Sequence, residues 1–248
     1  MKKRAQLTLF IILGILIFFA IVFFLIYIRK SEMFITQEQN IEACFSNNLQ
    51  REIKFLSFYA GLINPKFNYN YSGKIYPILC YTEEYLKPCV NQEPFLKDAF
   101  ENSLKERIKE DFEKCFKDYA DDLKKRGFDV EEGKISFDLK IEPEEVVVLI
   151  NAPTIIKKGD QSSQIRKFSY RYKTRLYDVI MIATSLIQYE TYYGDSEQMQ
   201  QMFFYPNIKI IKTRTENGIK TYSIIEKEED IEFNFAVRSY AFPPGGVI

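Results

Sequence analysis

Four cysteines carry the most specific chemistry in this 248-residue chain: Cys44, Cys80, Cys89 and Cys115. All of them follow an N-terminal apolar run, and an even number of thiols on the oxidising side of a membrane predicts disulfides. Three pairings are open. We favour Cys80–Cys89, which encloses a short stretch with a proline, together with Cys44–Cys115, because these two lie on separate predicted helices.

A metal centre is the alternative for the same cysteines. Structural zinc sites usually take pairs of cysteines two to four residues apart, and this sequence has no such pair. The chain also contains no histidine, which excludes Ser-His-Asp and Cys-His nucleophiles and histidine-ligated zinc or haem. We therefore predict no metal site, no cofactor and no catalytic residue.

Clustered carboxylates are the remaining groups that could act as general acids or bases. They occur at Asp121–Asp122, Glu144–Glu145 and Glu226–Asp230, and paired carboxylates can serve glycoside hydrolysis. No EF-hand, GxSxG, P-loop or GxGxxG motif accompanies them. We interpret the clusters as solvated turns and predict that the protein is not an enzyme, with an external hydrolase kept as an alternative.

Basic and aromatic residues alternate in Lys167–Lys173, a pattern that can hold single-stranded nucleic acid. A strand with its rings in the core and its basic side chains in water gives the same pattern. The net charge favours the strand over a nucleic-acid site, because residues 31–248 carry 29 basic against 34 acidic residues and are negative overall. We predict no nucleic-acid partner, and glycan stacking is the remaining ligand role for these rings.

The apolar run Leu7–Ile28 contains 22 residues with no charge and no proline. As a helix it would be roughly 33 Å long, enough to cross a hydrocarbon core of about 30 Å. It is longer than the apolar part of a signal peptide and lacks a small-x-small cleavage site, so we expect it to be retained. Lys2, Lys3 and Arg4 outweigh Arg29–Lys30, which predicts a cytoplasmic N-terminus and an extracytoplasmic body.

The segment Lys3–Thr8, which runs directly into the apolar helix, resembles the class III signal of archaeal type IV pilin-like proteins. The resemblance implies cleavage by a prepilin peptidase between Ala5 and Gln6, with the apolar helix kept on the mature protein. Major pilins have a glutamate as the fifth mature residue, where this chain has Phe10, and some minor subunits also lack it.

The whole chain also resembles the uncharacterised single-pass surface proteins of small-genome (DPANN-type) archaea. Those proteins begin with a stretch similar to Gln6–Gly14 and continue into a helix that bears a cysteine. This second resemblance implies a location at the cell surface and no particular activity.

Two amphipathic helices are predicted after the apolar run. Apolar residues recur at helical spacing in Thr36–Ala60, which Gly61 ends, and in Glu93–Arg126, which Gly127 ends. No helix breaker separates the apolar run from the first of them. Two layouts are therefore open. The first is one long helix that reaches Gly61, and the second is an anchor followed by a stalk and a separate helix.

The rest of the chain reads as loops, strands and one further helix. Residues 62–92 lack periodicity and are predicted to be irregular; they contain the glycosylation sequon that begins at Asn70. Residues 157–164 are predicted to form a polar loop, and 174–191 a buried helix. Strands are expected at 134–141, 146–150, 165–173, 207–214, 220–227 and 231–239, with a hairpin turn at Glu216–Gly218.

This order of elements predicts an α+β fold: an N-terminal transmembrane helix, a helical membrane-proximal part, and then an antiparallel sheet with packed helices. The expected domains are a basic tip with its anchor (1–30), a helical disulfide-braced region (31–127) and an α+β sheet region (128–248). The last two form either separate domains or one body, because the sheet needs a cover and helix 93–126 is the nearest one.

The predicted function is that of a membrane-anchored extracytoplasmic surface protein that acts by binding or as a structural component. It would contact the lipid bilayer through residues 7–28 and a protein or glycan partner at the cell surface. A minor type IV pilin-like filament subunit is the first alternative, and an extracellular hydrolase is the second.

Overall fold

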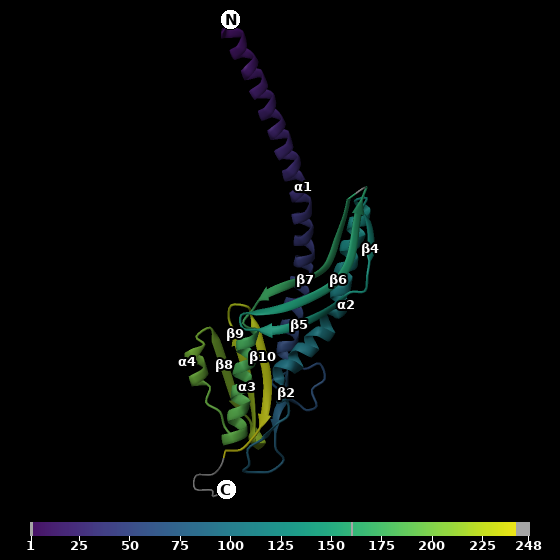
Figure 1. Cartoon of the computed structure of the whole chain (residues 1–248). Helices are drawn as coiled ribbons and strands as arrows, with labels where there is room; N and C mark the ends of the chain where they lie inside the picture. The colour runs from purple at the N-terminus through teal and green to yellow at the C-terminus, as the bar shows by residue number, and fades with distance from the viewer. Residues whose placement is uncertain (1, 160, 242–248) are drawn as a thin grey trace. The chain divides into compact units, whose positions relative to one another are not determined.

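The computed structural model describes the backbone of residues 2–159 and 161–241, and the side-chain surroundings of residues 13–25, 42–159, 162, 164, 167 and 169–241. The chain divides into two compact units, Met1–Cys44 and Phe45–Ile248. Figure 1 labels most of the helices and strands as they are named below.

The first unit is the N-terminal part of helix α1 (Lys2–Phe58), which continues without a break into the second unit. One long helix is therefore the correct choice between the two layouts that the sequence left open. Its described apolar side chains follow one another along the chain, so they point to every side of the helix. They are largely exposed, from Leu13 at 50% to Phe23 at 74%.

The structure corrects the predicted transmembrane helix over 7–28. Within the described residues, no helix has the length and apolar character that crossing a bilayer requires. The side chains described in that stretch are those of residues 13–25, fewer than the roughly 20 apolar residues of a spanning helix. The side chains of residues 7–12 and 26–28, and of the predicted cleavage site Ala5–Gln6, lie outside the described residues.

In the second unit, the end of α1 packs against helix α2 (Leu96–Lys125) through aromatic rings. The ring of Phe45 stacks on that of Phe112 at 4.3 Å between centroids and lies 5.5 Å from that of Phe116. Phe137 and Tyr170, from the neighbouring sheet, contact the cluster at 5.3 and 6.1 Å. The helix predicted over 93–126 is confirmed, and its apolar stripe forms this core.

Four antiparallel strands form the sheet that these rings contact. Strand β6 pairs with β7 along one edge, and along the other edge first with β5 and then with β4. The change of partner falls at Ala152–Pro153, where the β6–β7 register shifts. Figure 1 shows α2 lying along this sheet. The strands are β4 (Asp129–Glu132), β5 (Ser136–Glu142), β6 (Glu145–Lys158) and β7 (Gln161–Lys173).

The hairpin predicted over 134–150 is confirmed by β5 and β6, but the predicted loop over 157–164 is wrong. Strands β6 and β7 stay paired as far as Lys158 and Gln161. Ser162 and Gln164 are exposed near this turn. A polar ribbon of this kind carries none of the apolar alternation by which a half-buried strand is recognised.

The second sheet has six strands in the order β1-β2-β10-β9-β8, with β3 beside β2. Strand β10 runs parallel to β2, and the other pairs are antiparallel. The predicted antiparallel sheet is thus corrected to two sheets, one of them mixed, because no local pattern signals a pairing between distant strands. The strands are β1 (Asn68–Tyr71), β2 (Lys74–Tyr81), β3 (Val90–Asn91), β8 (Ile208–Arg214), β9 (Ile219–Glu226) and β10 (Ile231–Arg238).

Residues 62–92 therefore contain three strands, and the prediction of an irregular segment is wrong. Strand β2 is buried at consecutive positions such as Tyr76 and Pro77, so it lacks a two-residue alternation. A proline inside a segment also argues against a strand, because proline has no N–H to donate to the neighbouring strand. Asn70, the predicted glycosylation site, lies exposed on the outer strand β1.

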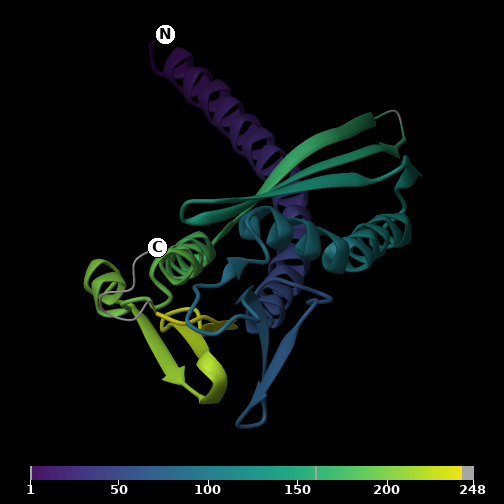
Figure 2. The ribbon, with the colours of Figure 1, turned by 90° about the horizontal axis from the view of Figure 1, so that it is seen from below.

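Helix α3 (Leu176–Tyr193) packs on the mixed sheet and confirms the helix predicted over 174–191. Figure 2 shows it beside strands β8–β10. A short helix, α4 (Met199–Phe204), follows and was not predicted. The β8–β9 hairpin is confirmed; its turn, η1 (Glu216–Gly218), holds Asn217 and Gly218 at φ of 58° and 70°, which suit these two residue types.

The structure contains the predicted disulfide between Cys80 and Cys89. Cys44 and Cys115 are disulfide-bonded as well, so none of the four cysteines is free. Both disulfides indicate an extracellular or otherwise oxidising location, because cytosolic thiols are normally kept reduced.

Candidate functional site

Glu190, near the end of α3, is a fully buried carboxylate. Its Oε2 accepts a hydrogen bond from Lys220 Nζ on β9 at 2.6 Å, and its Oε1 accepts one from the Tyr222 hydroxyl. Lys220 is itself only 5% exposed. A buried charge is tolerated when it is paired and hydrogen-bonded, so the two residues depend on each other.

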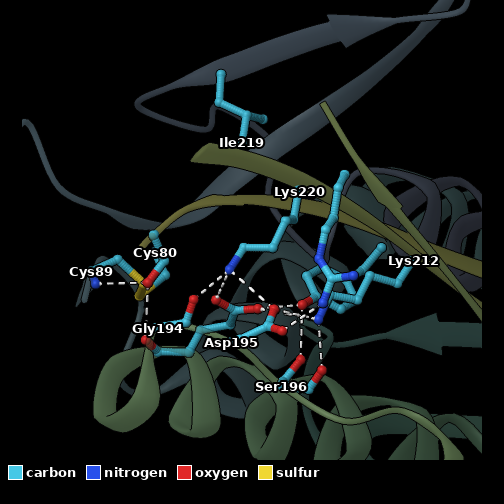
Figure 3. A network of polar contacts seen from close by, with 12 residues as sticks. Cys80, Cys89, Gly194, Asp195, Ser196, Lys212, Ile219 and Lys220 are labelled. Carbon is cyan, nitrogen blue, oxygen red and sulfur yellow. Dashed lines mark hydrogen bonds and ion pairs between the residues drawn. A yellow bond between two sulfur atoms is a disulfide. The ribbon is translucent and has the colours of Figure 1, made fainter. Parts of the chain in front are cut away.

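A second acid, Asp195, follows the helix and extends the network. Its Oδ1 accepts from Lys212 Nζ at 2.5 Å, and its Oδ2 accepts from Arg214 at 2.6 Å. Lys220 Nζ lies 3.4 Å from the same Oδ1. The side chain of Lys212 is 4% exposed, so two buried lysines face two acids. Figure 3 shows Lys220 and Lys212 both directed at Asp195. We call Glu190, Asp195, Lys212, Lys220 and Tyr222 the Glu190 network.

The electrostatics of the network fix its protonation state. Burial alone would raise the pKa of Asp195, but hydrogen bonds from Lys212 and Arg214 outweigh it and lower that pKa from 3.8 to about 2. Burial raises the pKa of Tyr222, and the negative charge of Glu190 raises it further. The tyrosine therefore stays a neutral hydrogen-bond donor to Glu190.

The backbone at the C-terminus of α3 contributes a carbonyl group to the network. Helix α3 ends at Gly194, whose φ of 69° is the left-handed conformation typical of a helix C-cap. Lys220 Nζ donates to the Gly194 carbonyl oxygen at 2.5 Å, a favourable place for a cation beside a helix C-terminus. A Cβ added at Gly194 would lie 1.8 Å from the Tyr240 carbonyl oxygen, so only glycine fits.

Ser239, just after β10, connects the network to the Cys80–Cys89 disulfide. Its hydroxyl donates to the Glu190 carbonyl oxygen at 3.0 Å and accepts from the Cys89 backbone N–H at 3.0 Å. Figure 3 shows the disulfide beside the network. The end of α3, the end of β10 and the disulfide loop are therefore held together.

Next to the network, the end of α3 and helix α4 expose large apolar side chains. Three tyrosines of α3 are 39–63% exposed, and three residues of α4 are 66–82% exposed. The rings of Tyr189 and Tyr193 stack at 5.9 Å. These residues form what we call the α3–α4 surface: Tyr189, Tyr192, Tyr193, Met199, Phe203 and Phe204.

Helix α4 is held in place by its other side chains. Gln201 Nε2 donates to the Ser185 hydroxyl of α3 at 3.0 Å. Met202 Sδ accepts from the backbone N–H of Ile210 on β8 at 3.3 Å. Because the helix is fixed to both neighbours, the outward position of Phe203 is imposed by the fold.

The acids of this region are held in ion pairs, and its exposed side chains are aromatic rings and a methionine. Every acid of the Glu190 network faces a lysine or arginine, which leaves neither Glu190 nor Asp195 as a general base. Among the residues whose side-chain surroundings the structure describes, no group of three or more cysteines and acids could hold a metal ion. Exposed aromatic residues and methionine are the types enriched at the centres of protein interfaces.

The acid clusters singled out in the sequence are not brought into a common site, and each has a structural partner. Arg126 pairs with Asp122, and Arg171 with Glu145. Glu229 accepts hydrogen bonds from the Thr174 hydroxyl and the Arg175 N–H at the start of α3. These contacts hold elements in place.

Sequence reasoning missed the Glu190 network. A signal was present, because Glu190 falls in the buried stripe of its helix, four residues after Leu186 and three after Ile187. An acid in an apolar stripe needs a buried partner. The partners Lys212 and Lys220 lie on strands whose arrangement the local sequence does not give.

Comparison with known proteins gives no further assignment. No protein-family model, no curated protein and no solved structure matches this chain.

Replacing Glu190 with glutamine should destabilise the protein strongly. Glu190→Gln leaves the buried Lys220 with only the more distant carboxylate of Asp195, at 3.4 Å, and breaking a buried ion pair by removing one partner typically costs about 3–5 kcal/mol. The matched control is Glu197→Gln, an exposed acid of the following loop, which should stay within about 0.5 kcal/mol of the original. Urea unfolding of the three proteins measures both. A cost for Glu190→Gln as small as that of the control would contradict the buried ion pair.

Asp195 should make stability depend on pH in the acid range. Its pKa of about 2 in the folded protein lies below its ordinary 3.8, so its contribution is complete above pH 3.8 and disappears as pH falls towards 2. Asp195→Asn should therefore cost most near neutrality and progressively less in acid. Unfolding free energies of both proteins from about pH 5 to about pH 2 test this. A difference that is constant with pH would be inconsistent with it.

Proposed function

We propose that this protein works outside the cytoplasm by binding a partner, which docks on the α3–α4 surface. The observation that carries the proposal is the exposure of six large apolar side chains on two helices, of which α3 is fixed by the Glu190 network and α4 by its contacts with Ser185 and Ile210. The exposed rings are neighbours within each helix, Tyr189 and Tyr192 beside Tyr193 on α3 and Phe203 beside Phe204 on α4. Clusters of exposed apolar side chains on a folded domain usually mark an interaction site, because they are costly to leave in water.

The charge of this region indicates the kind of partner. Residues 176–207 contain no lysine and no arginine, so the surface offers nothing to neutralise phosphates. Its acids Glu190 and Asp195 are already paired. A protein with an apolar patch, or an uncharged glycan that stacks on the tyrosines, fits such a surface. The disulfides favour an extracytoplasmic setting for this encounter.

A photo-crosslinking amino acid in place of Phe203 should capture the partner in living cells. The same residue in place of Phe67, which is 38% exposed on another part of the body, is the matched control and should capture nothing comparable. Phe204→Ser should reduce the yield at position 203 without unfolding the protein, since this side chain is 66% exposed. Equal yields at positions 203 and 67 would rule out a specific surface there.

A filament subunit of the pilin-like class is the second candidate function. The observation that favours it is α1, one unbroken helix from Lys2 to Phe58 whose residues 13–25 expose apolar side chains. A helix that is apolar on every side is normally buried in an assembly or a core. In a filament, the same helices from neighbouring copies would bury one another.

The mature N-terminus tests this second candidate. If the protein is processed as a pilin-like subunit, intact-mass analysis of the protein from its native cells should show a chain that begins at Gln6. Ala5→Asp should then block the cut and leave a longer chain. A native protein that still begins at Met1 removes the filament role.

A further inference from the structure

Strand β1 lies at the edge of the mixed sheet and pairs on one side only. Among the strands of the described chain, its partner is β2. The Ile78 N–H donates to the Phe67 carbonyl oxygen at 2.9 Å, which sets the phase of this ladder. Main-chain groups alternate in direction along an antiparallel strand, so the N–H and C=O groups of Asn68 and Asn70 point to the free edge.

Apart from its shortness, β1 carries none of the usual protections of a sheet edge. Natural edges are blunted by charged side chains, proline, bulges or a covering helix. The residues of β1, Asn68–Tyr71, include no charge and no proline, and their register with β2 is regular. The opposite edge of the sheet differs, because α4 lies against β8 and Met202 Sδ accepts the Ile210 N–H there.

The edge strand contains the one N-glycosylation sequon of the chain, Asn70-Tyr71-Ser72. All three residues are exposed. Ser72 begins the two-residue turn to β2 with a φ of 50°, and Gly73 completes it with a φ of 78°. The folded chain therefore leaves the sequon accessible, on a tight hairpin at the edge of the sheet.

The side chain of Asn70 points away from the tyrosine rings of its strand. The Tyr69 hydroxyl donates to Thr215 Oγ1 at 3.2 Å, and the Tyr71 ring stacks on the Tyr69 ring at 6.3 Å. Successive side chains of a strand point to opposite faces, so Asn70 lies on the other face. There it is directly opposite Ile75, which is 42% exposed and within reach of a sugar on Asn70.

We propose that Asn70 carries an N-linked oligosaccharide, and that this glycan shields the free edge of β1 from pairing with β1 of a second copy. A glycan is bulky and solvated, so it blocks the approach of another strand without any charge in β1. Sequons are used in secreted proteins, in agreement with the oxidising location that the disulfides indicate. The inference does not use the α3–α4 surface, so it is independent of the partner proposed above.

The modification is a glycosyl transfer from a lipid-linked oligosaccharide phosphate, catalysed by a separate transferase. The side-chain nitrogen of Asn70 forms a bond to the anomeric carbon of the first sugar. The bond between that carbon and the phosphate oxygen breaks, and the lipid phosphate leaves with the electron pair. The amide nitrogen gives up one proton, so no oxidant or reductant is needed.

Peptide mapping of the full-length protein from its native cells tests the attachment. Trypsin releases residues 67–74, and we expect this peptide to carry sugar on Asn70. Ser72→Asn removes the sequon and should leave the peptide bare, while asparagine suits the left-handed turn position and keeps the protein folded. Asn68→Gln is the matched control and should keep the glycan, because Asn68 is exposed on the same face but begins no sequon. A bare peptide in the unchanged protein, or sugar that persists in Ser72→Asn, would overturn the proposal.

Crosslinking between copies tests the shielding. Benzoylphenylalanine replaces Asn68 in the glycosylated protein and in Ser72→Asn, and covalent dimers are read on a reducing, denaturing gel after irradiation. We expect dimers that join two copies of residues 67–74 in Ser72→Asn only. Asn70→Lys also removes the glycan but places a charge in the edge strand, so it should give no such dimer. Absence of the dimer in Ser72→Asn, or an equal yield in the glycosylated protein, would show that the glycan does not shield this edge.

Discussion

The buried ion pair between Glu190 and Lys220 is the constraint around which the C-terminal half of the molecule is arranged. Glu190 is fully buried and Lys220 is only 5% exposed, so each charge is stabilised in the core mainly by the other. The pair joins a helix end to a strand of the mixed sheet. The hydrogen bonds of the pair are directional, whereas apolar burial is not. The pair therefore fixes the position of α3 on that sheet more narrowly than apolar packing alone would.

Further contacts spread this constraint to the surrounding chain. Lys220 also caps the carbonyl group of Gly194, and Ser239 connects Glu190 to the backbone beside Cys89. The segment that leaves α3 is thereby directed to α4, and the segment that leaves β10 is directed to the disulfide loop. The exposed apolar side chains of the α3–α4 surface thus depend on one buried network.

Much of the fold follows from local sequence, and the reasons for the failures are physical. The stripe of α2, the alternation of β5 and the Asn217-Gly218 turn are local signals and gave correct elements. Strand β2, with Pro77 inside it and burial at consecutive positions, has no such signal, and its parallel partner β10 lies far away in the sequence. Glu190 was recognisable as an acid in an apolar stripe, but its partner depends on strand positions that only the folded chain sets.

Hydrogen exchange of α4 tests most directly whether the buried pair holds the exposed surface in place. Residues 199–204 make no hydrogen bond to the Glu190 network themselves, so their protection in Glu190→Gln reports on the coupling and not on a lost contact. We predict that the amides of α4 and of the end of α3 exchange faster in the variant, under conditions where it remains folded. The exchange of the α2 amides should change only by as much as the change in the free energy of global unfolding explains. Unchanged exchange in α4, with the ion pair removed, would contradict the account.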